Sequence, residues 1–132
     1  MVGLLIITHD GVGSCLLETA VNTLGVCPLN ARVLAVAGNA DPDALALEAA
    51  DLARELDDGS GLLVLTDVYG STPSNIAAGL VRNRRAVMVA GINLPMLIRI
   101  LNYPQLDLDR LAEKAVSGGR DGVLCCKPDP YT

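Results

Sequence analysis

The residue whose side chain is best suited to catalysis is His9, the one histidine in a chain of 132 residues. It stands where the first apolar run of the chain ends and a loop that begins with Asp10 and Gly11 starts. An imidazole can act as a nucleophile and as a proton carrier near neutral pH. Because the carboxyl ends of strands carry the chemistry of open α/β sheets, His9 is a candidate nucleophile.

Asp67 takes the same place after the third apolar run that His9 takes after the first. If the two runs are neighbouring strands, its carboxylate can accept a hydrogen bond from one imidazole nitrogen and leave the other nitrogen free to attack. An aspartate before Gly70 and Ser71 is also typical of a turn or a helix cap. The joint placement of His9 and Asp67 at strand ends favours a functional pair.

The segment that follows Asp67 has the groups needed to hold a phosphoryl group. Gly70, Ser71 and Thr72 offer hydroxyls and backbone amides at a helix start, and such amides bind phosphate oxygens. We expect Thr72 to be the N-cap and Pro73 the first residue of that helix. An ordinary helix cap needs the same residue types. The presence of His9 as a candidate nucleophile is what favours phosphate binding by this segment. We therefore predict that Gly70, Ser71 and Thr72 bind phosphate.

Other ligand-binding motifs are absent from the sequence. Gly11 and Gly13 lack the third glycine of a dinucleotide fingerprint, since position 16 is Leu, and the chain has no Gly-Lys-Ser/Thr P-loop. Close packing of the chain against His9 accounts for these two glycines. The four cysteines lack the spacing of zinc ligands and fit idle thiols in a reducing compartment. We expect no metal and no cofactor.

The elements that must position these residues alternate between short apolar runs and segments of helical period. This alternation predicts an α/β fold with four buried parallel strands. We expect strands at residues 2–8, 32–37, 62–66 and 86–90, helices at 14–24, 42–56, 73–82, 94–101 and 108–117, and a short last strand at 122–126. Asp41 should cap the second helix before Pro42, and Gly118 with Gly119 should stop the last helix.

The composition fits one domain spanning residues 1–132, with 51% hydrophobic residues for its core. A net charge of -5, a pI near 4.6 and only 2% aromatic residues argue against nucleic acid and against an anionic membrane surface. Polar residues interrupt the apolar stretch 86–101, so no transmembrane span is expected, and no signal peptide is visible. The expected compartment is the cytoplasm.

Four segments together resemble a known family, the mannose-type enzyme IIA domains of the bacterial sugar phosphotransferase system. They are Thr8-His9, residues 67–75 (DVYGSTPSN), residues 90–97 (AGINLPML) and the ending at 118–122 (GGRDG). In that family the histidine matching His9 is phosphorylated on a ring nitrogen by the phosphocarrier protein HPr and passes the group to a IIB domain. The resemblance implies that Asp67 orients the ring and that the Thr72 hydroxyl assists catalysis.

The resemblance also implies an architecture and an assembly. The family fold is a doubly wound three-layer sandwich of four parallel strands plus one antiparallel C-terminal strand, which the two subunits of a homodimer exchange. Residues 122–126 match the exchanged strand. Family members are often fused to a IIB domain, whereas this sequence stops at Thr132. We therefore expect the IIB partner to act in trans, with membrane contact only through a permease complex.

Several alternatives compete with this interpretation. A histidine phosphatase or mutase needs an arginine before the histidine and a second histidine, but Thr8 precedes His9. A signalling receiver domain needs an acidic pair after the first strand, and only Asp10 is present there. A phosphotransfer subunit for dihydroxyacetone kinase and a regulatory phosphoacceptor without transport both stay open, and the sequence does not name the sugar.

Overall fold

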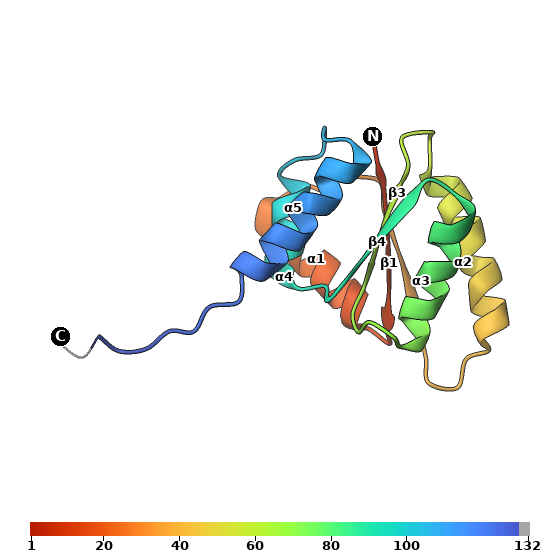
Figure 1. Ribbon diagram of the computed structural model, residues 1–132, viewed down its shortest axis with the longest axis horizontal. Helices are drawn as coiled ribbons and strands as arrows, with labels where there is room; N and C mark the ends of the chain where they lie inside the picture. The colour runs from red at the N-terminus through yellow and green to blue at the C-terminus, as the bar shows by residue number, and fades with distance from the viewer. Residues whose placement is uncertain (130–132) are drawn as a thin grey trace.

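The computed structural model describes residues 1–129 of the chain. Strands and helices alternate along most of this length (Figure 1). In chain order the elements are β1 (Gly3–His9), α1 (Val12–Leu24), β2 (Ala31–Val36), α2 (Pro42–Leu56), β3 (Leu62–Thr66), α3 (Thr72–Asn83), β4 (Ala86–Ala90), α4 (Leu94–Leu101) and α5 (Leu108–Asp121). The predicted elements are therefore present, except for the last strand.

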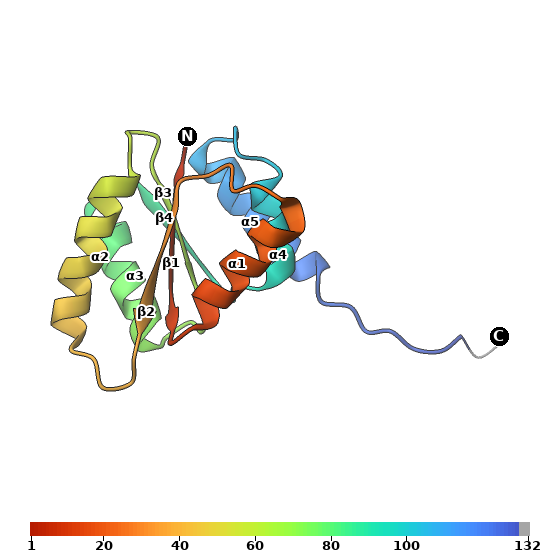
Figure 2. The ribbon, with the colours of Figure 1, turned by 180° about the vertical axis from the view of Figure 1, so that it is seen from behind.

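The four strands form one parallel sheet in the order β2-β1-β3-β4 within the described chain. Helices α1, α4 and α5 cover one face, and α2 and α3 cover the other (Figures 1 and 2). Strands β1 and β3 are buried on both faces, which explains their unbroken apolar sequences. The predicted doubly wound three-layer architecture is confirmed.

A separate apolar cluster fills the space on each side of the sheet. Leu4, Ile6 and Leu63 belong to the cluster under α1, α4 and α5, while Leu5 and Ile7 belong to the cluster under α2 and α3. Alternate residues of a strand point to opposite faces, so one continuous apolar strand supplies both cores. This two-sided burial fixes the central strands and, with them, the residues at their carboxyl ends.

The central strands β1 and β3 are direct neighbours. Ile7 lies opposite Thr66 in their parallel register, and His9 is the last residue of β1. Asp67 directly follows β3. The register therefore brings the two predicted catalytic residues to the same edge of the sheet.

Helix α5 extends past the point where the sequence predicted a stop. It runs through Gly118 and Gly119 to Asp121. A Cβ atom at Gly118 would lie 2.7 Å from the Cβ of Arg99, and one at Gly119 would lie 2.9 Å from the Cε of Met96. The prediction that these glycines end the helix was wrong, because their missing side chains let α5 pack closely against α4.

The expected antiparallel strand at 122–126 is not present within the described chain. Gly122 is the C-cap of α5, and residues 123–129 adopt neither helix nor strand. This tail runs away from the layered body (Figures 1 and 2). Over residues 1–129, the sheet therefore has the four parallel strands and lacks the fifth strand. No helix in residues 1–129 combines the length and apolar character needed to cross a membrane.

Candidate functional site

The imidazole of His9 is hydrogen-bonded to the carboxylate of Asp67 at the carboxyl edge of the sheet. The distance from His9 Nδ1 to Asp67 Oδ2 is 2.8 Å. The backbone N–H of His9 donates to the same oxygen at 3.0 Å, and the N–H of Val68 donates to Oδ1 at 2.9 Å. Three donors therefore fix the carboxylate, and the carboxylate fixes the ring. The structure thus contains the hydrogen bond between the His9 and Asp67 side chains that the sequence predicts.

This contact decides which ring nitrogen is available for chemistry. An ionised carboxylate can only accept hydrogen bonds, so a neutral His9 ring donates its proton from Nδ1 and keeps a lone pair on Nε2. The His9 side chain is 46% exposed, whereas that of Asp67 is 13% exposed. Within residues 1–129, Nε2 has no hydrogen-bond partner. The site thus presents an oriented nitrogen nucleophile to solvent.

The environment of Asp67 keeps its carboxyl ionised. Partial burial raises the pKa of this group, but hydrogen bonds from the His9 backbone, the His9 ring and the Val68 backbone outweigh that effect. The net result is a pKa below the ordinary value of 3.8. A carboxylate held ionised in this way can stabilise positive charge on the neighbouring imidazole.

Thr8 stabilises the turn between β1 and α1 through its side chain. Its buried Oγ1 accepts a hydrogen bond from the N–H of Gly13 at 2.8 Å. Asp10 takes a left-handed backbone conformation with a φ of 40°, which aspartate tolerates better than most residues. This role of Thr8 could not be predicted from the sequence, because any β-branched residue fits a buried strand equally well.

The two glycines after His9 have different roles from the one predicted. A Cβ atom at Gly13 would lie 2.7 Å from Ile6 Cγ2 and 2.9 Å from Thr8 Oγ1, while one at Gly11 would meet no atom within 4 Å. Gly13 therefore packs against the sheet beneath the turn rather than against His9. Gly11 is the N-cap of α1 and makes no close contact of this kind.

The loop between β3 and α3 holds the three residues predicted to bind phosphate. Gly70 has a φ of 88°, which favours glycine. Ser71, not Thr72, is the N-cap of α3, so that part of the prediction was wrong. The Ser71 hydroxyl donates to the carbonyl of Val68 at 2.5 Å, whereas Thr72 is exposed and its hydroxyl bonds to no described residue. The Thr72 hydroxyl is therefore available to a ligand, and that of Ser71 closes the loop.

Residues 1–129 contain no group of three or more histidine, cysteine or acidic side chains placed to hold an ion. The four cysteines are free thiols, and each is exposed: Cys15, Cys27, Cys125 and Cys126.

The site is an exposed imidazole that an ionised carboxylate orients at the carboxyl edge of a doubly wound α/β sheet, an arrangement that can act as a nitrogen nucleophile. A family model described as "PTS system fructose IIA component" matches residues 3–116. The chain belongs to this family of IIA components of the sugar phosphotransferase system (PTS).

Individual relatives agree with the family model. The chain is 33% identical over 132 residues to the mannose-specific EIIAB component of Escherichia coli K12, covering 98% of this chain and 41% of that protein. The chain thus spans about two fifths of the length of this relative. It is also 36% identical over 50 residues to the fructose-specific EIIA component of Bacillus subtilis 168, which is 37% of this chain and 34% of that one.

Solved structures share the fold. The mannose/sorbose-specific IIA subunit of Enterococcus faecalis superposes with a TM-score of 0.87 at 22% identity, covering 99% of this chain and 98% of that one. The PTS component EIIA of Streptococcus agalactiae gives a TM-score of 0.82 at 22% identity, covering 95% and 97% of the two chains. At this level of identity the likeness concerns the fold alone.

Proposed function

We propose that the chain is a phosphocarrier that accepts a phosphoryl group on Nε2 of His9 from phospho-HPr and passes it to a IIB domain. The observation that carries this proposal is the 2.8 Å contact between His9 Nδ1 and Asp67, which leaves Nε2 as the free nucleophile. Membership of the IIA family supports the same chemistry. Residues 1–132 are proposed to form one IIA domain.

The proposed transfer exchanges one phosphorus–nitrogen bond for another. The lone pair of His9 Nε2 attacks phosphorus while the bond to the donor histidine breaks, and the donor ring takes back that electron pair. Little covalent work is required of the protein, so positioning and charge dominate the rate. As the His9 ring becomes cationic, the Asp67 carboxylate stabilises it and retains the Nδ1 proton.

The phosphoryl oxygens are proposed to lie at the start of α3. Backbone amides at a helix N-terminus attract anions, and no acidic residue occupies the first turn of α3. In this proposal the amides of Gly70 and Thr72 bind the phosphoryl group, and the exposed hydroxyl of Thr72 donates a further hydrogen bond in the transition state. The N–H of Ser71 already donates to the carbonyl of Val68 at 3.2 Å and is therefore left out of the proposed phosphate-binding set. The hydroxyl of Ser71 is excluded from this role because it already donates to Val68.

Sugar uptake is the process we propose for this phosphorelay, since the E. coli relative is a mannose-specific PTS component. The free, exposed thiols fit a reducing cytoplasm. Two other acceptors remain as alternatives: a regulatory target without transport, and dihydroxyacetone kinase. Chasing the labelled protein with a IIB domain or with the kinase distinguishes them, because only the true acceptor removes the label.

The test of the carrier proposal is phosphorylation in a reconstituted system. Incubation with phosphoenolpyruvate, enzyme I and HPr should add the mass of one phosphoryl group to the wild-type chain, with the acid lability of a phosphohistidine. His9→Ala should fold normally, because the exposed ring contributes little burial, and should take up no label. Label on His9→Ala would refute the assignment.

We further propose that the carrier is a homodimer in which residues 122–126 form the expected antiparallel strand on the partner. Strand β4 is paired only with β3 in the described chain, so its other edge is free. A groove of about 790 Å³ between β4 and α5 includes Val87, Val89 and Val116 in its lining. The tail carries Val123 and Leu124, which are 75% and 77% exposed. An apolar segment and a free apolar strand edge are complementary.

The oligomeric state tests this second proposal. Leu124→Asp should convert the dimer into a monomer in light-scattering measurements, because a charge would have to be buried beside β4. Leu47→Asp is the matched control, since Leu47 is 72% exposed on α2 and lies outside the groove. A wild-type monomer, or a Leu124→Asp dimer of wild-type stability, would refute the exchange.

A further inference from the structure

Three exposed apolar side chains lie on the two segments that carry His9 and Asp67. Val12 is the first residue of α1, and Val68 and Tyr69 directly follow Asp67. Their exposed fractions are 43%, 58% and 79%. Single exposed apolar residues are normal, but several gathered around a reactive group indicate a surface that a partner covers. We call Val12, Val68 and Tyr69 the apolar patch.

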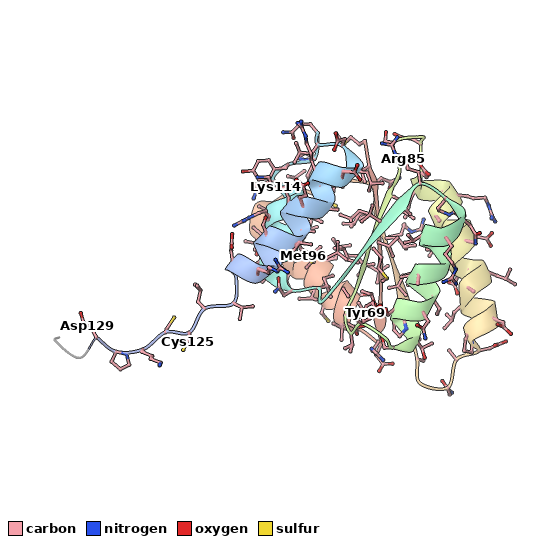
Figure 3. All side chains as sticks on the ribbon, viewed as in Figure 1. Tyr69, Arg85, Met96, Lys114, Cys125 and Asp129 are labelled. Carbon is pink, nitrogen blue, oxygen red and sulfur yellow. The ribbon has the colours of Figure 1, made fainter. Side chains whose placement is uncertain are left out.

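The fold itself does not use the side chain of Tyr69. Within residues 1–129, its hydroxyl makes no hydrogen bond and its ring makes no cation–π or other ring contact. The loop is already fixed by the hydrogen bonds from Val68 N–H to Asp67 and from the Ser71 hydroxyl to Val68. Figure 3 shows Tyr69 at the lower end of the molecule, away from Arg85 at the opposite end. A large aromatic ring is thus exposed at the site, and no hydrogen bond or ring contact within the described residues accounts for it.

We propose that the apolar patch is the docking surface for the phosphoryl donor, with Tyr69 as its anchor. This inference rests on the proposed function and identifies how the donor protein is bound. The donor ring must approach His9 Nε2 in line, so the surface around the donor's own histidine must cover the residues beside His9. Aromatic residues near the centre of an interface contribute most of the binding energy. An exposed tyrosine next to the reacting pair fits that position.

The charges around the patch favour a protein over other partners. The four connections at the carboxyl edge of the sheet are residues 10–11, 37–41, 67–71 and 91–93, and they contain three aspartates and no lysine or arginine. An anionic membrane or a nucleic acid would be repelled there. The partner that fits has apolar residues around its phosphohistidine and basic residues at the rim.

Steady-state kinetics with phospho-HPr as the donor test the anchor. Tyr69→Ser should raise KM by about 10-fold or more, as loss of an interface hot spot does, while kcat stays within about twofold. Tyr69→Phe should behave like wild type, because the ring provides the contact area. Leu47→Ser is the control: this equally exposed residue on α2 should leave KM unchanged.

A small donor separates docking from chemistry. Phosphoramidate transfers its phosphoryl group when Nε2 attacks phosphorus and the phosphorus–nitrogen bond breaks to release ammonia, and it needs no protein surface. Tyr69→Ser should therefore be labelled by phosphoramidate at the wild-type rate. An unchanged KM for phospho-HPr, or equal slowing with both donors, would overturn the docking proposal. Failure of wild type to accept phosphate from phospho-HPr would instead refute the proposed function.

Discussion

At the scale of single residues, the site depends on one carboxylate that performs two tasks. Asp67 binds both the backbone N–H and the Nδ1 atom of His9, so it fixes the end of β1 and the tautomer of the ring together. An amide of the same shape retains much of the first task and loses the second, because its NH₂ group can donate to the ring and favour the wrong tautomer.

Asp67→Asn should therefore impair chemistry more than docking. We expect the rate of phosphoryl transfer from phospho-HPr to fall by about 100-fold or more, since loss of the orienting carboxylate of a histidine nucleophile has costs of this order. KM should change by less than about threefold. Rapid-quench measurements give the rate, and ¹⁵N spectra of the imidazole report the tautomer. A variant with the wild-type rate would contradict the orienting role.

The pKa of Asp67 also predicts how stability depends on pH. Its pKa is lowered in the folded chain although partial burial opposes this, because the hydrogen bonds from His9 and Val68 outweigh burial. A carboxyl with a lower pKa in the folded state stabilises that state above the unfolded pKa, ordinarily 3.8, and this contribution disappears as the pH falls through the folded pKa.

Urea denaturation of wild type and Asp67→Asn at several pH values checks this expectation. The difference in free energy of unfolding should be largest near neutral pH and should narrow below about pH 4. A difference that does not change with pH would show that the ionised form of Asp67 contributes nothing to stability.

At the scale of elements, the β1–α1 turn depends on the space beneath Gly13. Gly13→Ala places a Cβ atom 2.7 Å from Ile6 Cγ2 and breaks the approach of the helix to Thr8. Overpacking of this kind costs about 1–3 kcal/mol of unfolding free energy. Gly38→Ala is the control, because a Cβ atom at Gly38 meets nothing within 4 Å, and it should be neutral or slightly stabilising. Equal effects in chemical denaturation would contradict the packing argument.

The helix and strand pattern could be predicted because each element carries its own signal. Asp41 with Pro42 marks the start of α2, and the Asp41 side chain does accept from the N–H of Asp43. The end of α5 could not be predicted in this way. Gly118 and Gly119 have the composition of a helix stop, and only their close approach to Arg99 and Met96 shows that they serve helix packing.

The two main residues of the site could be predicted from the sequence, but the residues that stabilise the loops around them could not. His9 and Asp67 stand at the ends of apolar runs, so the parallel topology alone brings them together. The roles of Thr8 and Ser71 depend on hydrogen bonds to Gly13 and Val68, which no local pattern specifies. The choice of Ser71 over Thr72 as the N-cap also depends on loop geometry, because both residue types cap helices well.

At the scale of the whole molecule, the connections at the two ends of the sheet differ in their basic charge. The connections at the carboxyl edge, where His9 lies, carry aspartates such as Asp10 and Asp41 and no arginine or lysine, whereas those at the opposite edge carry Arg84 and Arg85 beside Asp57, Asp58 and Asp107. Figure 3 shows Tyr69 and Arg85 at these opposite ends. A field of this kind orients an approaching partner before contact.

This difference in charge predicts that the rate of association with the donor depends on salt concentration. Substitution of one acidic residue can test this dependence. Association with phospho-HPr, followed by stopped flow, should slow by roughly 10-fold from low to high ionic strength, as steered associations do. Asp41→Asn should weaken that dependence while keeping the cap of α2, since asparagine caps helices as well as aspartate. Asp58→Asn removes the same charge near the amino terminus, where Asp58 pairs with the Met1 amine at 3.1 Å, and should leave the dependence unchanged. If both variants respond alike, total charge rather than its placement governs the encounter.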